Sequence, residues 1–196
     1  MAALKLDSNL RKKEIREAAM MAFKKKGFLN TTMEDVVALT SLSKGGVYYY
    51  YKNTVDIMHD IMIDGMHYRV DIIEAALKNG RYKDDDFMAE QLFAKIVDDN
   101  PYMDIYVDFL IAKKNNEKLE KLFQELKEET LKEFENLSKD LDISLLNEKL
   151  HIYDLLTDMI NSFIIGAEIL SARENFSENK SLMVEVFKLI LNQRRS

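Results

Sequence analysis

The chain has 196 residues, of which 47% are hydrophobic and 32% are charged, and its formal net charge is −6. This composition excludes a disordered chain, because nearly half of the residues can be buried, and it disfavours a membrane span, because the uncharged stretch at residues 159–167 has only nine residues where a span needs roughly 20. The absence of Cys excludes disulfides and thiolate metal sites, and one Pro with six Gly favours long helices, so the sequence predicts an all-helical cytoplasmic protein.

The first quarter of the chain differs in charge from the rest. Residues 1–54 hold ten basic groups against five acidic ones, a balance of +5, so the other 142 residues carry −11. With this division one end of the protein can attract a polyanion while the remainder resists non-specific coating of nucleic acid. A solvated lysine-rich surface is the alternative interpretation, and charge alone does not separate the two.

Two helices are predicted at the start of this basic part. Apolar residues at helical spacing predict the first over residues 8–26, and Gly27 ends it. Thr32, with Asp35 three positions later, has the pattern of a capping box and predicts a second, short helix that ends near residue 39.

A third short helix is predicted over residues 44–51, with Ser43 as its cap after a tight turn. Its outward face is basic, aromatic and rich in glycine. Lysine can meet a phosphate or a guanine edge, glycine lets the backbone approach DNA closely, and tyrosine offers a hydroxyl to phosphate and a ring face to thymine methyls. Each glycine costs roughly 1 kcal/mol in a helix relative to Ala, which a purely structural helix would have little reason to carry. The pattern is typical of a helix-turn-helix with its recognition helix in the major groove.

Six longer helices are predicted in the rest of the chain, which gives about nine in total. Asn79-Gly80 ends the fourth, and Pro101 suits the first turn of the sixth. The interruptions are expected at residues 99–101, 115–116, 139–144 and 175–177. The expected helices lie at residues 54–79, 85–98, 101–114, 117–138, 147–173 and 178–193.

Residues 10–57 resemble the N-terminal signature of the TetR/AcrR family of bacterial transcription regulators. The residues that carry this resemblance are Ile15, Ala18-Ala19, Phe23, Gly27-Phe28, Thr31-Thr32-Met33, Asp35-Val36, Leu42-Ser43-Lys44-Gly45-Gly46-Val47-Tyr48 and Tyr50-Tyr51-Lys52. The resemblance implies a DNA-binding domain at residues 1–53, a divergent ligand-binding and dimerisation domain at residues 54–196, and a homodimer formed through the last two helices.

Carried over by position, the resemblance assigns roles in the basic domain. It implies that Lys44, Gly45, Gly46, Tyr48 and Tyr49 face DNA, that Thr32 and Lys52 touch phosphate, and that Val47 and Tyr51 lie in the core. The chain departs from the family pattern at Val37, at Thr40-Ser41 and at Thr54. The last departure replaces a frequent lysine, which leaves Lys52 and the basic first helix to supply the charge for phosphate.

The last two predicted helices carry more apolar residues than one core-facing side of a helix can hold. Pairing them with the same helices of a second copy would give a four-helix bundle, with Gly166 allowing close approach, and would set two recognition helices about 34 Å apart or a multiple of that distance. Packing only within the chain is the alternative. The predicted interface residues are Met159, Ile160, Phe163, Ile164, Gly166, Ala167, Leu170, Met183, Val186, Phe187 and Ile190.

Methionines one turn apart in the fourth predicted helix, with aromatic residues in the sixth and seventh, suggest a pocket for an apolar or amphipathic effector, because flexible thioethers suit adaptable cavities. An ordinary core stripe is the alternative. The predicted pocket residues are Met58, Met62, Met66, Tyr102, Met103, Tyr106, Phe109 and Phe123.

Four polar residues at helical spacing, Asp60, Asp64, His67 and Asp71, could in principle bind a metal ion, but a solvated stripe explains them more simply. No catalytic triad or phosphate-binding loop occurs, so we expect no enzyme, cofactor or metal site.

The sequence therefore predicts a dimeric transcriptional repressor on a palindromic operator in double-stranded DNA, released by a small molecule. A helical small-molecule-binding protein or enzyme without DNA binding, and a regulator without an effector, are the alternatives.

Overall fold

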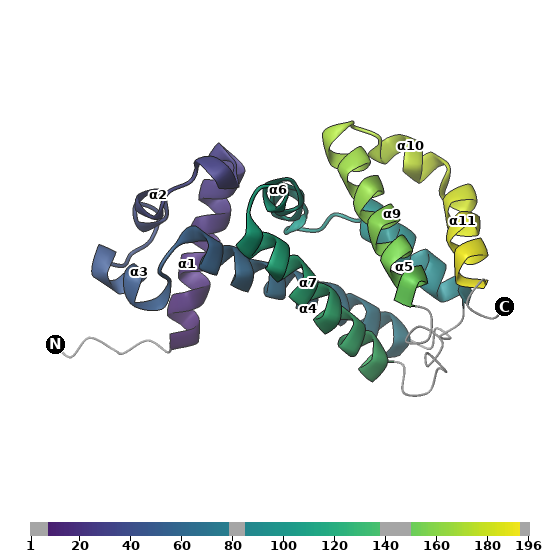
Figure 1. Ribbon diagram of the computed structural model, residues 1–196, viewed down its shortest axis with the longest axis horizontal. Coiled ribbons are helices and arrows are strands. Elements are labelled where there is room, and N and C mark those ends of the chain that lie inside the picture. Colours follow the sequence, from purple (N-terminus) through teal and green to yellow (C-terminus); the bar gives the residue numbers. More distant parts are fainter. Residues whose placement is uncertain (1–7, 79–84, 138–149, 193–196) are drawn as a thin grey trace. The chain divides into compact units, whose positions relative to one another are not determined.

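The computed structural model describes residues 8–78, 85–137 and 150–192, and all the regular elements in these ranges are helical (Figure 1). This confirms the all-α prediction, with ten α-helices in the described part of the chain against about nine expected. The elements are α1 (Ser8–Lys26), the short 3-10 helix η1 (Phe28–Asn30), α2 (Met33–Val37), α3 (Lys44–Tyr50), α4 (Thr54–Lys78), α5 (Asp85–Val97), α6 (Met103–Lys113), α7 (Glu117–Leu137), α9 (Leu150–Ile169), α10 (Arg173–Glu178) and α11 (Lys180–Asn192).

The predicted helix boundaries are wrong at the C-terminal end of α9. This helix ends at Ile169, and residues 175–177, expected to interrupt the fold, lie inside α10. Ser171 has the left-handed φ of 56°, and the Ala172 N–H donates to the Gly166 carbonyl at 3.1 Å, so the chain turns back on the last turn of α9. The pattern of apolar residues did not reveal this bend.

Smaller differences occur elsewhere. Pro101 lies in a turn before α6 instead of in its first helical turn, and α2 ends two residues earlier than predicted. The predicted helix end at residues 79–80, the interruption at 139–144 and the helix start at 147 fall outside the described residues. None of the helices described is long and apolar enough to cross a bilayer.

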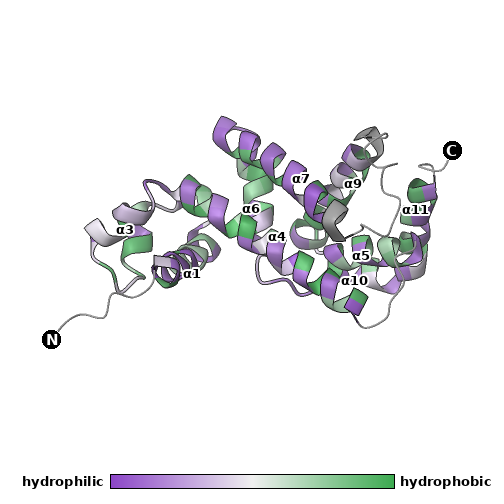
Figure 2. Ribbon diagram, turned by 90° about the horizontal axis from the view of Figure 1, so that it is seen from below, coloured by the Kyte–Doolittle hydropathy of each residue, from purple (hydrophilic) through white to green (hydrophobic). Residues whose placement is uncertain are grey.

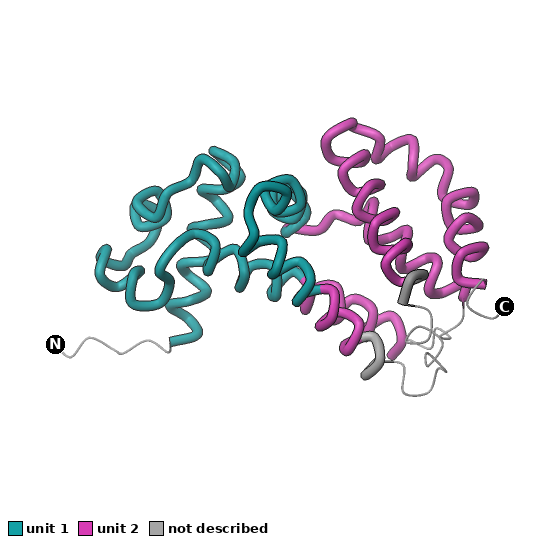
Figure 3. The backbone as a smooth tube through the Cα atoms, viewed as in Figure 1, with its two compact units in different colours: residues 1–65, 102–126 teal, residues 66–101, 127–196 magenta. Residues whose placement is uncertain are grey.

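The chain divides into two compact units (Figure 3). Unit 1 comprises Met1–Gly65 and Tyr102–Leu126, and unit 2 comprises Met66–Pro101 and Lys127–Ser196. Helices α4 and α7 contribute residues to both, and Figure 2 shows hydrophobic and hydrophilic residues alternating along them, as expected of amphipathic helices. The predicted division into residues 1–53 and 54–196 concerns function and stays a prediction.

In unit 1, α1 packs against α2, η1 and α6. The buried residues of α1 follow the i, i+3, i+4 pattern that predicted the helix, and Phe23 meets Phe28 edge to face with ring centroids 5.2 Å apart. These contacts fix the position of α1 against the short helices that follow. The buried residues of α1 are Ile15, Ala18, Ala19, Ala22 and Phe23.

In unit 2, α5 packs against α9 and α11. Phe163 of α9 makes edge-to-face contacts with Phe176 of α10 and Phe187 of α11, at centroid distances of 5.6 and 6.2 Å. Arg69 donates to the Gln91 carbonyl and pairs with Asp98 at 3.2 Å. Aromatic contacts and the half-buried Arg69 therefore join the helices of the unit.

Candidate nucleic-acid interface

A glycine turn joins α1 to the short helices. Gly27 has φ of 77°, a left-handed conformation that favours glycine, and its N–H donates to the Phe23 carbonyl at 2.7 Å. The next backbone N–H, that of Phe28, donates to Asp108 Oδ2 at 3.0 Å. The chain is thereby held in place immediately before α2.

The predicted capping box of α2 is present. Asp35 N–H donates to Thr32 Oγ1 at 3.2 Å, and Thr32 N–H donates to Asp35 Oδ2 at 2.9 Å. The Lys26 ammonium also donates to Asp35, and this bond together with those from Thr32 lowers the pKa of Asp35 to about 2. The cap therefore carries a carboxylate that stays ionised well below neutral pH.

The described residues place the predicted side chains of α3 on two sides of this helix. Ser43 caps it by accepting from the Gly46 N–H at 3.2 Å, and Val47 is fully buried. Tyr51, the C-cap, is also buried, as expected. Lys44 and Gly45 are exposed, Gly46 and Tyr48 are half-buried, and the Tyr49 side chain is 77% exposed.

The two glycines of α3 are not required by contacts within the chain. A Cβ added at Gly45 would meet no described atom within 4 Å, and one added at Gly46 would lie in ordinary contact, 3.4 Å from Ser43 Oγ. Neither residue has a positive φ. Their cost in helix propensity is therefore not offset by packing in unit 1.

One acidic residue occupies part of this surface, which the sequence did not reveal. The Lys44 ammonium donates to Glu34 Oε1 of α2 at 2.8 Å, and Tyr48 Oη donates to the same oxygen at 3.4 Å. Lys44 also lies 5.6 Å from the centroid of the Tyr48 ring. Two predicted DNA-facing groups thus share one carboxylate.

The two predicted phosphate-binding residues are exposed but have partners in the chain. The Thr32 hydroxyl takes part in the capping box, and Lys52 Nζ donates to the Tyr48 carbonyl at 2.7 Å. The Lys52 backbone N–H donates to Asp56 Oδ2 at 3.2 Å. Lys52 thus lies just beyond the C-terminal end of α3, and its role as a phosphate contact stays a prediction.

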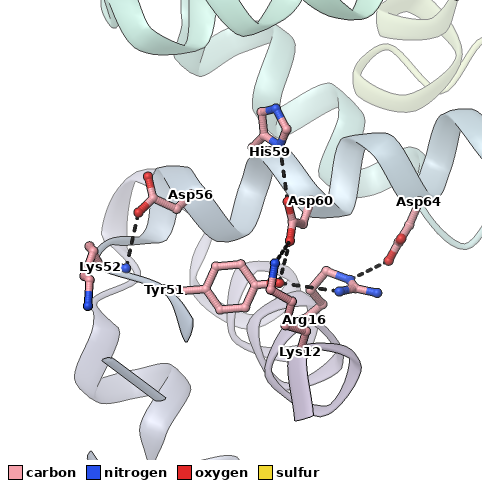
Figure 4. Close-up of polar contacts among 8 residues, drawn as sticks. All are labelled: Lys12, Arg16, Tyr51, Lys52, Asp56, His59, Asp60 and Asp64. Carbon is pink, nitrogen blue, oxygen red and sulfur yellow. Dashed lines mark hydrogen bonds and ion pairs between the residues drawn. The ribbon is translucent and has the colours of Figure 1, made fainter. Parts of the chain in front are cut away.

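A polar cluster joins α1, the end of α3 and α4 (Figure 4). Tyr51 Oη donates to Asp60 Oδ2 at 2.7 Å, and Arg16 Nε donates to Asp64 Oδ2 at 2.6 Å. Lys12 lies 3.4 Å from Asp60 Oδ2, and the Arg16 guanidinium also donates to Tyr51 Oη at 3.4 Å. The interpretation of Asp60 and Asp64 as part of a solvated stripe is therefore wrong, because basic residues of α1 cover both carboxylates.

Electrostatic effects in this cluster oppose one another. Burial raises the pKa of Tyr51. Burial alone would raise the pKa of Asp60 as well, but the bonds from Tyr51 and His59 and the charge of Lys12 lower it. A sequence signal existed, because Lys12 and Arg16 recur at i, i+4 on α1 as Asp60 and Asp64 do on α4. Only the structure shows that these side chains of the two helices reach one another.

Six of the seven basic side chains of α1 have acidic partners. A phosphate that approaches this helix must compete with carboxylates, which a count of charges does not show. The pairs are Arg11–Glu14, Lys12–Asp60, Lys13–Glu17, Arg16–Asp64, Lys24–Asp104 and Lys26–Asp35.

Most of the predicted pocket residues are buried in unit 1. Tyr102 and Tyr106 are half-buried there, whereas Met66 belongs to unit 2. Phe109 lies 6.3 Å from Phe123, centroid to centroid, and a Cβ added at Gly65 would lie 3.3 Å from the Tyr102 side chain. This packing also suits an ordinary core, so the pocket stays a prediction. Its buried members are Met58, Met62, Met103, Phe109 and Phe123.

Part of the predicted dimer interface needs correction. Ile160, Ile164, Ala167 and Phe187 are at most 4% exposed, because they pack within unit 2, and a surface contact cannot use them. The space beside Gly166 is taken by Phe176, 3.5 Å from where a Cβ would lie.

Other predicted interface residues reach the surface of unit 2. Leu170 is 74% exposed, and Met159, Phe163, Met183, Val186 and Ile190 are half-buried. Four further apolar side chains of α9 and α11 are also exposed. These are Leu155, Ile169, Leu182 and Leu189.

The geometry defines an all-helical protein whose N-terminal part is a three-helix domain of the helix-turn-helix class. Residues 15–61 match the family described as bacterial regulatory proteins, tetR family. The N-terminal domain of this chain is therefore similar to the DNA-binding domain of that family.

Comparison with single proteins agrees. An HTH-type transcriptional regulator of Bacillus subtilis, YfiR, is 46% identical over 56 residues, which span 29% of this chain and about a quarter (27%) of that protein. The structure of Salmonella enterica GusR superposes with a TM-score of 0.72 over 97% of this chain and 98% of GusR, at 15% identity. The regulator FadR from Bacillus subtilis in complex with stearoyl-CoA gives 0.66 over 89% and 96%, at 14% identity. At these identities the two structures show a shared fold alone.

Proposed function

We propose that the protein is a DNA-binding transcriptional regulator that acts as a homodimer, represses from a palindromic operator and is released by a small apolar or amphipathic effector. The observation that carries the proposal is the exposed face of α3, with Lys44, Gly45 and Tyr49 on a capped helix whose glycines the chain itself does not need. Gly45 has no side chain, so the backbone of α3 can approach a DNA groove closely, with the ammonium of Lys44 and the hydroxyl of Tyr49 beside it.

The dimer is supported by exposed apolar side chains on α9 and α11. Leu182 and Leu189, at i and i+7, lie on one face of α11 and are 67% and 64% exposed. Leu170 at the end of α9 is 74% exposed. Large apolar side chains that repeat along one exposed helix face are typical of an interaction site. A two-fold pair would present two recognition helices to adjacent major-groove half-sites.

The proposed effector is supported by the composition of the predicted pocket and by one protein of the same fold. Five of the eight predicted pocket residues are buried in unit 1, and one protein of the same fold, FadR of Bacillus subtilis, is in complex with stearoyl-CoA, an amphipathic ligand. The effector would bind more tightly to a dimer whose two recognition helices are spaced wrongly for the operator. A preference of about 1.4 kcal/mol for that conformation would reduce operator affinity tenfold.

The alternative is a helical small-molecule-binding protein or enzyme that keeps the fold without binding DNA. The test is a gel shift with DNA captured by the purified protein from fragmented genomic DNA of its source. We expect Lys44→Ala with Tyr48→Ala to abolish retention and to leave the mass in solution unchanged. The control is Lys121→Ala, which removes one cation from the exposed surface of α7. Retention by the double variant, or no capture of DNA by the wild type, would contradict the proposal.

A further inference from the structure

An acidic residue lies within the surface proposed to face DNA. Glu34 is on α2, yet its Oε1 is 2.8 Å from Lys44 Nζ and 3.4 Å from Tyr48 Oη of α3. The Lys44 and Glu34 side chains are 66% and 61% exposed, so this pair lies on the surface and not in the packing between the helices. Its contribution to folding is correspondingly small.

The carboxylate is ionised wherever the protein would meet DNA. The hydrogen bond from Lys44 is the largest cause that lowers the pKa of Glu34, and Tyr48 adds to it. A phosphate that takes Lys44 must therefore replace a partner of equal charge. Glu34, left behind, then faces the negative backbone of the duplex.

Non-specific and specific complexes with DNA differ in the groups that they place near the Glu34 carboxylate. Non-specific binding depends almost entirely on phosphates, which repel Glu34. An operator also presents base edges, and the N4 amino group of cytosine is a donor that a glutamate can accept from in the major groove. The same side chain then opposes one kind of complex and is accommodated in the other.

We propose that Glu34 is a specificity-determining residue, which holds Lys44 in the free protein and so weakens binding to non-specific duplex DNA more than binding to the operator. This inference rests on the proposed function. It assigns the contact between α2 and α3 a role in discrimination against wrong sequences.

The experiment compares Glu34→Gln with the wild type on a duplex of random sequence and on the captured operator over a series of salt concentrations. On random DNA we expect the variant to bind several-fold more tightly, with a log–log salt slope steeper by about 0.9, the value for one additional phosphate neutralised. The ratio of operator to random affinity should fall.

The matched control is Glu17→Gln. Glu17 pairs with Lys13 on α1 with nearly the same exposures, 62% and 64%, so this variant makes the same change in net charge away from α3. A gain for Glu34→Gln no larger than for Glu17→Gln would overturn the proposal. Such a result would show an effect of net charge alone.

A second comparison tests whether Glu34→Gln changes the salt slope through Lys44. In a Lys44→Ala background, Glu34→Gln should no longer steepen the salt slope on random DNA, because the cation that it releases is absent. A slope that steepens equally in both backgrounds would overturn the assignment while leaving the DNA-binding function intact. A wild type that retains no duplex at all would instead overturn the proposed function.

Discussion

Gly45 lies on the exposed side of α3, where a methyl group would meet no described atom of the chain within 4 Å. Gly45→Ala should therefore raise the free energy of unfolding, by up to about 1 kcal/mol from helix propensity. It should also weaken DNA binding, because the methyl group would stand between the backbone and the groove. Urea unfolding and gel shifts on the same preparation test both effects, and a stabilised variant with unchanged affinity would contradict the role of Gly45.

Asp35 makes the free energy of unfolding of the N-terminal domain depend on pH. Its pKa is lowered to about 2 from an ordinary 3.8, so its contribution to folding is fully present above about pH 4 and is lost as the pH falls towards 2. We expect Asp35→Asn to show a smaller decline in the free energy of unfolding over this window than the wild type. Urea titrations at several pH values would measure it, and parallel curves for the two proteins would contradict the prediction.

At the scale of elements, the cluster of Figure 4 joins three helices through Tyr51. Tyr51→Phe removes the bond to Asp60 at 2.7 Å and leaves that half-buried carboxylate with weaker partners. We expect a loss of about 1 kcal/mol in the free energy of unfolding, measured with urea. Tyr49→Phe, at a residue 77% exposed, should change it by less than about 0.5 kcal/mol. Equal effects of the two changes would show that the hydroxyl of Tyr51 does not stabilise the cluster.

The sequence predicted those elements whose signals are local. Periodic apolar residues located most of the helices, and Thr32 and Ser43 identified two N-caps, because a cap depends on residues three positions apart. The pairing of Glu34 with Lys44 spans ten positions and depends on the angle between two helices, which no local pattern encodes.

The same reason explains the errors in the dimer surface and at the end of α9. Apolar spacing shows that a residue is buried but not whether its own chain or a partner buries it, so Ile164 and Phe187 were assigned to the interface although they pack within unit 2. Serine is not a usual residue for a left-handed position, so nothing at Ser171 indicated a helix end.

At the scale of the whole molecule, the proposed dimer is open to direct measurement. Leu182→Glu with Leu189→Glu places two charges on the exposed face of α11 and should give a monomer by sedimentation. Operator affinity should then fall by more than tenfold, because each half-site would be bound alone. Ile111→Glu, at an apolar residue of α6 that is 49% exposed, is the control for a new surface charge and should leave the mass unchanged. A wild type that sediments as a monomer at high concentration would contradict the dimer.

Ser171, the left-handed residue just after α9, is a position at which the stability of the protein can be raised. A side chain in this conformation costs about 1 kcal/mol relative to glycine, which adopts it without strain. Ser171→Gly should therefore raise the melting temperature while leaving every residue of α3 unchanged. Such a variant would be a more stable protein for crystallisation with DNA. It would also be a more stable background for substitutions in α3 that destabilise the protein.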